Sequence, residues 1–376
     1  MNAMTERTQL LHRWWQEVMD HVDPALFAIV MAISVLGLLV LYSAANEMTA
    51  RVLSQAEKML VAIGVMLVIA NCSPQFILRF AVPLYIVGIV LLLAVAVGGE
   101  VIKGARRWLA IPGVGNIQPS ELMKIALPLI LAWYFEKHEG MINWRNFGVA
   151  AVLIAIPFAL IVRQPDLGTS LLVGACGFYI LYLAGLDWRL ILGGALAAGL
   201  VIFAAWEFNW LHDYQKQRIL TVFEPSRDAQ DAGWHTNQAA IAIGAGGVLG
   251  KGWLNGSQTH LEFLPERHTD FIIAVYGEEF GLLGVSVLLL LYLMLLGRSF
   301  VIALRASTLA GRLMAGAMAL MFFTYAFVNM GMVSGLLPVV GVPLPFVSYG
   351  GSAMMTLFIA VGILMSVATH RKLVSS

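Results

Sequence analysis

The segment Leu313–Thr369 contains 57 consecutive residues without a single Asp, Glu, Lys or Arg. As one helix it would be about 85 Å long at about 1.5 Å per residue, whereas the hydrocarbon core of a bilayer is about 30 Å thick. The segment must therefore hold two membrane-spanning helices. Pro338, Gly341, Pro343 and Pro345 predict the break between them, because proline and glycine interrupt helices.

Eight further apolar runs precede this segment, which brings the number of predicted spans to ten. They are Ala25–Tyr42, Met59–Cys72, Phe80–Gly98, Leu122–Phe135, Phe147–Val162, Leu167–Leu186, Leu190–Trp206 and Phe271–Gly297. Only 12% of the residues are charged, against about 25% in an ordinary globular domain, too few to cover a water-facing surface. The sequence therefore predicts an all-α polytopic integral membrane protein with about ten transmembrane helices, in a single domain over residues 1–376.

Two of these runs, Met59–Cys72 and Leu122–Phe135, have only 14 residues each, a length that also suits an interfacial helix. Lys58 precedes the first run and Lys124 lies near the start of the second. Both side chains can extend toward the headgroups, which would lengthen the apolar spans. We predict that both runs cross the membrane.

An even number of spans places both termini on the same side of the membrane. The positive-inside rule leaves out long loops, and without segment 207–270 the Lys and Arg residues favour the side that carries the termini. Both termini are therefore predicted to be cytoplasmic. The loop 99–121, the long loop 207–270 between the seventh and eighth spans, and the Pro/Gly-rich segment 336–349 then face outward.

The two longer outer loops carry much of the polar chemistry of the chain. Loop 99–121 contains Arg106, Arg107 and Trp108, and segment 207–270 holds 13 of the 45 charged residues. Loops of this length and chemistry are usually functional rather than simple connections. The alternative interpretation is a solvated cap over the helix bundle.

Several charged residues are predicted to lie at membrane depth. Glu121 and Lys124 are three residues apart on one helix face, so they can form an ion pair. Asp166 begins the sixth span, and Glu278 and Glu279 lie about two turns into the eighth. A carboxylate in hydrocarbon costs several kcal/mol unless it is paired or faces water, so these side chains line a cavity or form internal ion pairs.

The densest cluster of charges, Leu264–Asp270, directly precedes the eighth span. We expect Thr269 to cap this helix, which would place Asp270 in its first turn. The helix dipole, Arg267 and His268 all favour the ionised carboxylate, which suits a general base. The alternative role for Asp270 is that of a helix-dipole partner alone.

Two other patterns are weaker. His260, Glu262, Glu266 and His268 match no familiar zinc spacing, so we predict no metal site there. Gly244–Gly252 resembles a phosphate-binding loop, but it lacks the Ser or Thr after Lys251, and a close-packed turn is the better interpretation. The formal net charge of +1 gives no reason to expect nucleic-acid binding.

The order and content of several strings resemble the SEDS family (shape, elongation, division and sporulation) along nearly the whole chain. These strings are KGARRWL at 103–109, QPSELMKIA at 118–126, QPDLGTS at 164–170, HDYQKQRI at 212–219, GKGWLNGSQ at 250–258, EFLPERHTDF at 262–271 and GMVSGLLPVVGVPLPFVSYGGS at 331–352. QPDLGTS and HDYQKQRI are more similar to the elongation branch than to the division branch.

The resemblance implies a ten-span inner-membrane bundle that polymerises lipid II into glycan strands on the outer leaflet and releases undecaprenyl pyrophosphate. It also implies a class B penicillin-binding protein as crosslinking partner, together with other proteins of the elongation complex. The family's essential aspartate corresponds to Asp270, its loop tryptophan to Trp108, and the acid and lysine of the fourth span to Glu121 and Lys124.

The reaction that the resemblance implies needs a base for a sugar hydroxyl and cations for a leaving diphosphate. We assign Asp270 as the base. The predicted substrate-binding residues are Arg106, Arg107, Trp108, Glu121, Lys124, Asp166, Arg218, Arg267 and His268. No cofactor is assigned, and a divalent cation stays an open alternative. Two rival functions also stay open, a flippase or transporter of lipid-linked sugars and a non-catalytic scaffold for a crosslinking transpeptidase.

Overall fold

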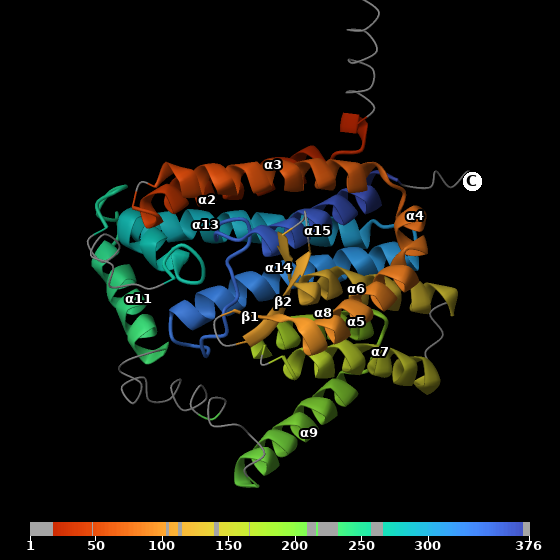
Figure 1. Ribbon diagram of the computed structural model, residues 1–376. Helices are drawn as coiled ribbons and strands as arrows, with labels where there is room; N and C mark the ends of the chain where they lie inside the picture. The colour runs from red at the N-terminus through yellow and green to blue at the C-terminus, as the bar shows by residue number, and fades with distance from the viewer. Residues whose placement is uncertain are drawn as a thin grey trace, which may run out of the picture.

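The computed structural model describes residues 18–46, 48–102, 105–111, 115–138, 143–164, 166–208, 216, 232–256 and 266–370. Within them, ten helices correspond to the ten predicted spans, and most lie side by side in one bundle (Figure 1). They are α2 (Pro24–Ala44), α3 (Thr49–Asn71), α5 (Ala81–Gly98), α6 (Pro119–Lys137), α7 (Trp144–Val162), α8 (Leu167–Leu183), α9 (Trp188–Glu207), α13 (Ile272–Leu304), α14 (Leu309–Val333) and α15 (Gly351–Thr369). Two further helices are α4 (Pro74–Arg79) and α11 (Ala232–Gly246).

Seven of the described helices are long and apolar enough to cross a bilayer, namely α2, α3, α5, α7, α13, α14 and α15. The apolar helix α8 is shorter at 17 residues. The two short runs of the sequence belong to longer helices, since α3 has 23 residues and α6 has 19. The long uncharged segment is divided into α14 and α15, as the prolines predicted. The protein is therefore an all-α membrane bundle in its main architecture.

The helix N-termini follow the local sequence. Asp23 accepts a 2.9 Å hydrogen bond from the backbone N–H of Leu26 at the start of α2, where Pro24 occupies the first helical position. Thr308 caps α14 in the same way through the backbone N–H of Gly311. Such caps satisfy backbone donors that would otherwise have no partner at a helix start.

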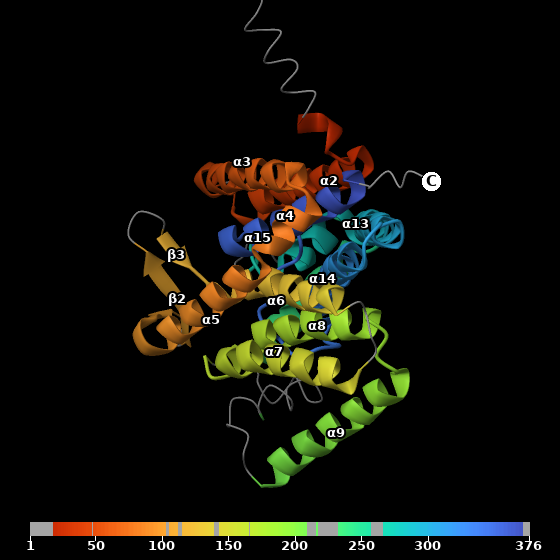
Figure 2. The same cartoon turned by 90° about the vertical axis from the view of Figure 1, so that its right-hand side faces the viewer.

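Loop 99–121 contains a small antiparallel sheet that the sequence analysis did not predict. Its strands, β1 (Glu100–Ile102), β2 (Ala105–Ile111) and β3 (Gly115–Ile117), pair in the order β1-β2-β3. The sheet projects beside α5 and α6 (Figure 2). Two of its strands have only three residues, too short to show an alternating pattern in the sequence.

Helix α13 is interrupted at Gly281, whose backbone angles are φ 65° and ψ −164°. A turn over residues 247–252 fills the interruption. The backbone N–H groups of Lys251 and Gly252 donate to the carbonyls of Glu278 and Glu279, each at 3.0 Å. The Gly-rich string therefore forms a close-packed turn, and the phosphate-loop alternative is wrong.

The close packing at this break requires glycine. A Cβ atom on Gly250 would lie 2.1 Å from the carbonyl oxygen of Glu279, and one on Gly281 would lie 2.3 Å from the backbone nitrogen of Gly250. Both glycines also have a positive φ, which side chains other than glycine rarely adopt.

The segment between α14 and α15 is folded into the bundle rather than laid over it. Val342, Leu344, Phe346 and Val347 are each at most 3% exposed. The hydroxyl of Tyr292 donates a 2.7 Å hydrogen bond to the carbonyl of Pro345, which satisfies one of the backbone groups that burial would otherwise leave without a partner.

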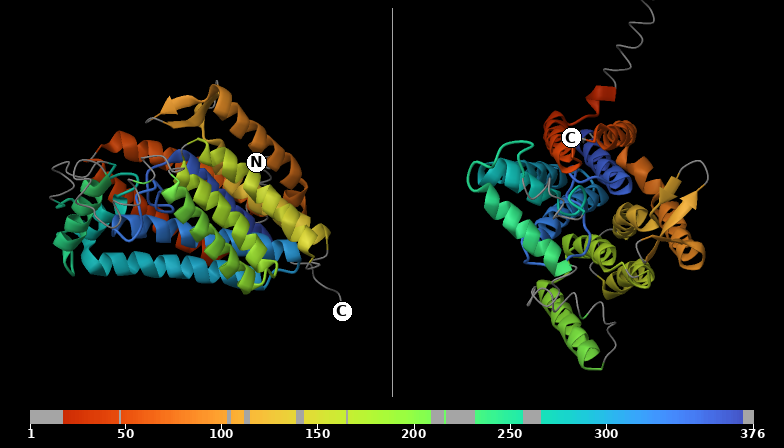
Figure 3. Two further views of the ribbon diagram at one scale, coloured as in Figure 1. Left: turned by 90° about the horizontal axis from the view of Figure 1, so that it is seen from below. Right: turned by 60° about the vertical axis from the view of Figure 1, so that its left-hand side comes forward.

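The two ends of the described chain meet on one side of the bundle. The rings of His21 and His370 stack with centroids 4.5 Å apart, and Arg298 forms an ion pair with Asp23. Arg298 lies toward the carboxyl end of α13, whereas Asp270 precedes its amino end. Helix α13 runs along the bundle, with α11 crossing at one end (Figure 3). Asp270 therefore lies at the end of the bundle away from His21 and His370.

Candidate functional site

Asp270 lies in a turn before α13 rather than inside its first helical turn. The helix begins at Ile272, so the expectation that Thr269 caps it is wrong. The Thr269 hydroxyl instead donates to Glu266, at 3.1 Å to the backbone carbonyl and 2.9 Å to the carboxylate oxygen Oε2. These bonds lie within a turn over residues 266–271, in which Asp270 is half-buried.

The segment 342–349 runs beside this turn and is hydrogen-bonded to its backbone. The Ser348 hydroxyl donates to the Thr269 carbonyl at 2.6 Å, and the Tyr349 N–H donates to the His268 carbonyl at 2.9 Å. Asn329 on α14 donates to the carbonyls of both Asp270 and Val342. The backbone on either side of Asp270 is therefore fixed by two separate elements.

Asp270 lines a polar cavity of about 490 Å³. Five other residues that the sequence analysis assigned to the site line the same cavity: Arg107, Trp108, Glu121, Lys124 and Asp166. They come from β2, α6 and the start of α8, which are far apart in the sequence. The fold thus brings most of the predicted site into one space, with the proposed base on its wall.

The predicted ion pair between Glu121 and Lys124 is confirmed. Lys124 Nζ lies 2.6 Å from Glu121 Oε1 and also donates to the hydroxyl of Tyr325. Lys124 is only 1% exposed, and the second carboxylate oxygen of Glu121 has no hydrogen-bond partner among the described residues.

Asp166 lines the cavity and contacts residues of three elements. It caps α8 by accepting a 3.1 Å hydrogen bond from the backbone N–H of Thr169. Its second oxygen accepts from Gln118 Nε2 at 3.2 Å and lies 3.6 Å from Arg107 Nε. This carboxylate therefore positions Arg107 beside the cavity.

The remaining predicted residues are arranged differently. Arg106 is exposed on the opposite face of β2 from Arg107, because side chains alternate along a strand, and it does not line the described cavity. Arg267 is buried and the ring of His268 packs edge-on to Tyr349 at 6.0 Å; neither lines that cavity. Arg218 lies outside the described residues.

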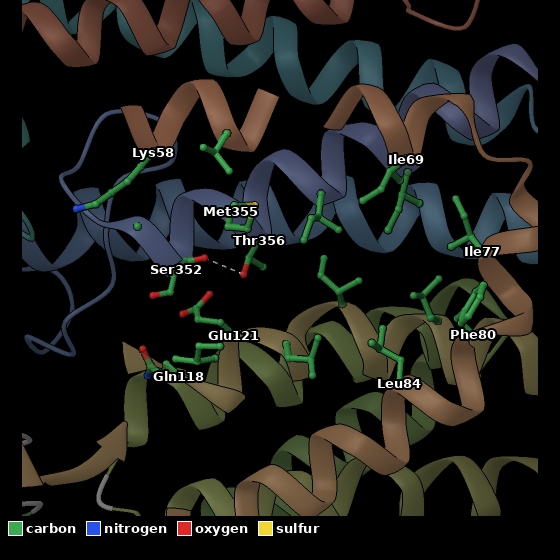
Figure 4. Close-up of a pocket in the computed structure, with 18 of the residues that line it drawn as sticks. Lys58, Ile69, Ile77, Phe80, Leu84, Gln118, Glu121, Ser352, Met355 and Thr356 are labelled. Carbon is green, nitrogen blue, oxygen red and sulfur yellow. Dashed lines mark hydrogen bonds between the residues drawn. The ribbon is translucent and has the colours of Figure 1, made fainter. Parts of the chain in front are cut away.

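A second, largely apolar cavity of about 900 Å³ adjoins the first. Figure 4 shows Lys58, Gln118, Glu121 and Ser352 at one end of it, and the apolar side chains Ile69, Ile77, Phe80 and Leu84 toward the other. Four residues line both cavities: Asn116, Gln118, Glu121 and Ser352. The polar cavity and the apolar one therefore adjoin and share part of their walls.

The sequence did not reveal that Lys58 and Tyr349 contact each other beside the two cavities. Lys58 Nζ donates to the Tyr349 hydroxyl at 3.1 Å, and this hydrogen bond, with a smaller contribution from Ser54, lowers the pKa of Tyr349. The two residues are 291 positions apart, so no local pattern could have paired them. The string SYGGS was visible in the sequence, but nothing in it pointed to Lys58.

Glu278 and Glu279 form internal contacts at the break of α13 rather than lining either cavity. Lys251 Nζ lies 2.7 Å from Glu278 Oε1, and the Ser43 hydroxyl donates to Glu279. This arrangement agrees with the ion-pair alternative for Glu278, whereas Glu279 accepts a hydrogen bond from the hydroxyl of Ser43.

Among the described residues, no group of three or more His, Cys, Asp or Glu side chains is arranged to hold a metal ion. Of the four residues weighed for zinc, His260 and Glu262 lie outside the described part of the chain.

Residues 23–373 match the FtsW/RodA/SpoVE family, described as "Cell cycle protein". The peptidoglycan glycosyltransferase MrdB of Escherichia coli K12 is 47% identical over 362 residues, which covers 96% of this chain and 97% of the relative. A probable peptidoglycan glycosyltransferase FtsW of Geobacter metallireducens is 36% identical over 367 residues, covering 94% and 96%.

Two solved structures share the fold. A chain from "Structural coordination of polymerization and crosslinking by a peptidoglycan synthase complex" superimposes with a TM-score of 0.80 at 32% identity, covering 92% of this chain and 97% of that one. The rod shape determining protein RodA of Thermus thermophilus superimposes with a TM-score of 0.71 at 30% identity, covering 93% and 97%. The similarity extends over nearly the full length of each chain.

Proposed function

The chain belongs to the FtsW/RodA/SpoVE family of cell cycle proteins, and from this membership we propose that it polymerises lipid II into glycan strands for cell-wall elongation. It is a multi-pass inner-membrane peptidoglycan glycosyltransferase. The elongation role is supported by the higher identity to MrdB, at 47%, than to FtsW, at 36%.

The observation that carries the proposal is the position of Asp270 on the wall of a polar cavity that adjoins an apolar one. A lipid-linked disaccharide has the same two-part character. Its sugars need hydrogen-bonding groups, whereas its polyprenyl tail needs an apolar channel. The two cavities together match such a molecule better than a soluble sugar.

Asp270 acts as the general base in this mechanism. A bond forms between the acceptor hydroxyl oxygen and the anomeric carbon of the donor, while the anomeric carbon–oxygen bond to the diphosphate breaks. The hydroxyl proton passes to the Asp270 carboxylate, and the bonding electrons leave with undecaprenyl pyrophosphate. Asn329 and Ser348 fix the turn, so the carboxylate need not reorganise before it accepts the proton.

The other side chains of the polar cavity hold the reacting groups. Glu121 and Asp166 offer carboxylate oxygens to sugar hydroxyls, and Trp108 offers a ring face to a sugar. Arg107 and Lys124 place positive charge where negative charge develops on the departing phosphate.

The same geometry, together with the distribution of Lys and Arg, supports a direction for the protein in the membrane. Asp270 lies at the end of the bundle opposite His21 and His370. With both termini in the cytoplasm, as the distribution of Lys and Arg favours, the polar cavity faces the periplasm or exterior.

The crosslinking partner of this chain is proposed to be a class B penicillin-binding protein. The structural neighbour with a TM-score of 0.80 comes from a complex whose description joins polymerization with crosslinking. A membrane polymerase coupled to a transpeptidase would crosslink strands as they emerge. Other elongation-complex proteins would join the same assembly.

Polymerisation by the purified protein in detergent tests the proposal. Wild type is expected to form glycan strands from purified lipid II, and Asp270→Asn is expected to lose at least about 100-fold of the rate, because the base is removed. Asp20→Asn, an exposed acid near the other end of the bundle, is the matched control. In detergent no transport across a membrane can occur, so strand formation separates an enzyme from a flippase.

Equal rates for wild type and Asp270→Asn would overturn the assigned base. A wild-type protein that forms no strands, yet binds a transpeptidase, would instead favour the scaffold alternative.

A further inference from the structure

Lys58 lies on α3 at the boundary between the two cavities. Its side chain lines the apolar cavity, while its hydrogen-bond partner Tyr349 lines the polar one. Lys58 Nζ lies 3.1 Å from the Tyr349 hydroxyl and 4.7 Å from the centroid of the same ring. The ammonium group is thus held in one place at the polar end of the apolar cavity (Figure 4).

Lys58 differs from the other cations beside the two cavities in what it contacts. Arg107 lies beside Asp166, and Lys124 is paired with Glu121. Within the described chain the polar contact of Lys58 is with the neutral hydroxyl of Tyr349, and Glu57, next to it in sequence, is exposed. The positive charge of Lys58 is therefore not neutralised by a carboxylate at this position.

The neighbouring start of α15 adds further donors at the same place. The helix begins at Gly351 after Gly350, and no side chain caps it. A Cβ atom on Gly351 would lie 3.3 Å from Lys58 Cδ, so the Lys58 stem crosses directly over this first turn. Unsatisfied N–H groups at a helix start favour phosphate, and here they lie beside a fixed ammonium group.

In a lipid-linked sugar the diphosphate lies between the tail and the sugar. When the tail occupies the apolar cavity and the sugar the polar one, the diphosphate must lie where the cavities meet. Lys58, Tyr349 and Ser352 surround that boundary. We propose that Lys58 is the residue that binds the diphosphate of a polyprenyl-diphosphate donor, with Tyr349 orienting it.

This inference rests on the proposed function, because it places a group of that substrate. It adds a residue that neither the family resemblance nor the spacing of the sequence assigned to the site. It also gives the cations beside the two cavities different roles. Lys58 holds the phosphate next to the tail, whereas Arg107 and Lys124 lie on the sugar side.

Equilibrium binding of two probes that differ only in their head group tests the inference. The probes are geranylgeranyl diphosphate and geranylgeraniol, measured with purified protein in detergent. Lys58→Gln is expected to weaken binding of the diphosphate about tenfold, the effect of losing one charge-assisted hydrogen bond, and to leave binding of the alcohol unchanged. Lys58→Arg is expected to retain most of the affinity, because it keeps the charge.

Lys137→Gln is the matched control. Lys137 also lies over an aromatic ring, that of Trp133 at 5.0 Å. It is the last residue of α6, however, and lines neither described cavity. It is expected to change neither affinity. A Lys58→Gln protein that binds both probes as wild type does, or loses both equally, would overturn the inference.

Inorganic pyrophosphate distinguishes a lipid head group from a free anion. Wild type is expected to bind it at least about tenfold more weakly than geranylgeranyl diphosphate, because the tail contributes apolar burial. Equal affinities would contradict the assignment to a lipid.

Asp270→Asn keeps the failure of this inference separate from the failure of the proposed function. That variant is expected to bind geranylgeranyl diphosphate at least as tightly as wild type does, whatever its polymerisation rate, because it keeps Lys58 and removes a negative charge. Retained binding by Lys58→Gln therefore rejects only the diphosphate site, and polymerisation by Asp270→Asn rejects only the assigned base.

Discussion

The side-chain amide of Asn329 donates a 2.9 Å hydrogen bond to the backbone carbonyl of Asp270. The same amide donates at 2.7 Å to the carbonyl of Val342, and Asn329 itself is 0% exposed. One residue of α14 therefore holds together the turn that carries the proposed base and the buried segment that follows α14.

Asn329→Leu is expected to lower kcat for glycan polymerisation about tenfold or more while changing KM little. The substitution nearly conserves volume but removes both hydrogen bonds, so the Asp270 turn shifts, and small displacements of a catalytic group are costly. Steady-state kinetics with lipid II measure the effect. Thr324→Val removes a hydroxyl elsewhere on α14, where it contacts Tyr179, and serves as control. An Asn329→Leu enzyme with wild-type kcat would show that the amide does not position Asp270.

Arg107→Ala is expected to weaken lipid II binding about tenfold and Arg106→Ala distinctly less. Arg107 lines the polar cavity beside Asp166, whereas Arg106 projects from the other face of β2. The magnitude is that of a lost charge-assisted hydrogen bond. Apparent affinities for lipid II, compared between these adjacent arginines, check the prediction. Similar losses for both would mean that the sheet acts through its overall charge.

Lys124→Met is expected to lower the free energy of unfolding by about 3 kcal/mol, because it leaves the buried Glu121 carboxylate without its cation. Adding Glu121→Gln should recover part of that loss. Thermal unfolding of the single and double variants in detergent measures both effects. A double variant no more stable than Lys124→Met would contradict this account of the pair.

Gly281→Ala is expected to destabilise the protein by several kcal/mol more than Gly247→Ala. Both glycines have a positive φ, 65° and 55°, so both substitutions strain the backbone. Only at Gly281 does the new Cβ also meet backbone atoms, at 2.3 Å from Gly250 N, while nothing lies within 4 Å of the Cβ at Gly247. Unfolding temperatures in detergent compare the two. Equal shifts would mean that the turn at the break yields to an added methyl group.

Lys58→Gln is expected to raise the pKa of Tyr349, because the hydrogen bond from Lys58 is the main cause of its lowering. The sign follows from the phenolate, which the ammonium group stabilises. A depressed pKa adds its full stability above the unfolded value of about 10, and this gain is lost as the pH falls through the folded value. At neutral pH it therefore contributes nothing. Tyrosine-selective NMR titration measures the change, and an unaltered Tyr349 titration would contradict the contact.

The parts of the fold with a local signal could be predicted from the sequence. The uncharged segment Leu313–Thr369 is too long for one span, and it forms α14 and α15. Glu121 and Lys124 are three residues apart in a helix, and they form the predicted pair. In both cases the period and rise of the helix determine the outcome.

The parts that depend on contacts distant in the sequence could not be predicted. Thr269 has the right chemistry for a helix cap, but residues 266–271 form a turn in which its hydroxyl donates to Glu266, and α13 begins only at Ile272. Lys58 meets Tyr349 only because α3 packs against the start of α15, which the order of residues does not reveal. The strands β1 and β3 are three residues long and pair only through β2.

The interruption of α13 at Gly281 does not act as a swivel. The turn 247–252 is hydrogen-bonded to α13 on both sides of the break. Lys251 and Gly252 of the turn donate to the carbonyls of residues 278 and 279, before the break. Leu282 and Leu283, after the break, donate to carbonyls of the turn. Rotation at Gly281 would rupture these bonds together, and in an apolar medium each is worth about 4–6 kcal/mol. The break at Gly281 therefore does not let the first part of α13, and the turn with Asp270 that precedes it, rotate relative to the rest of the helix.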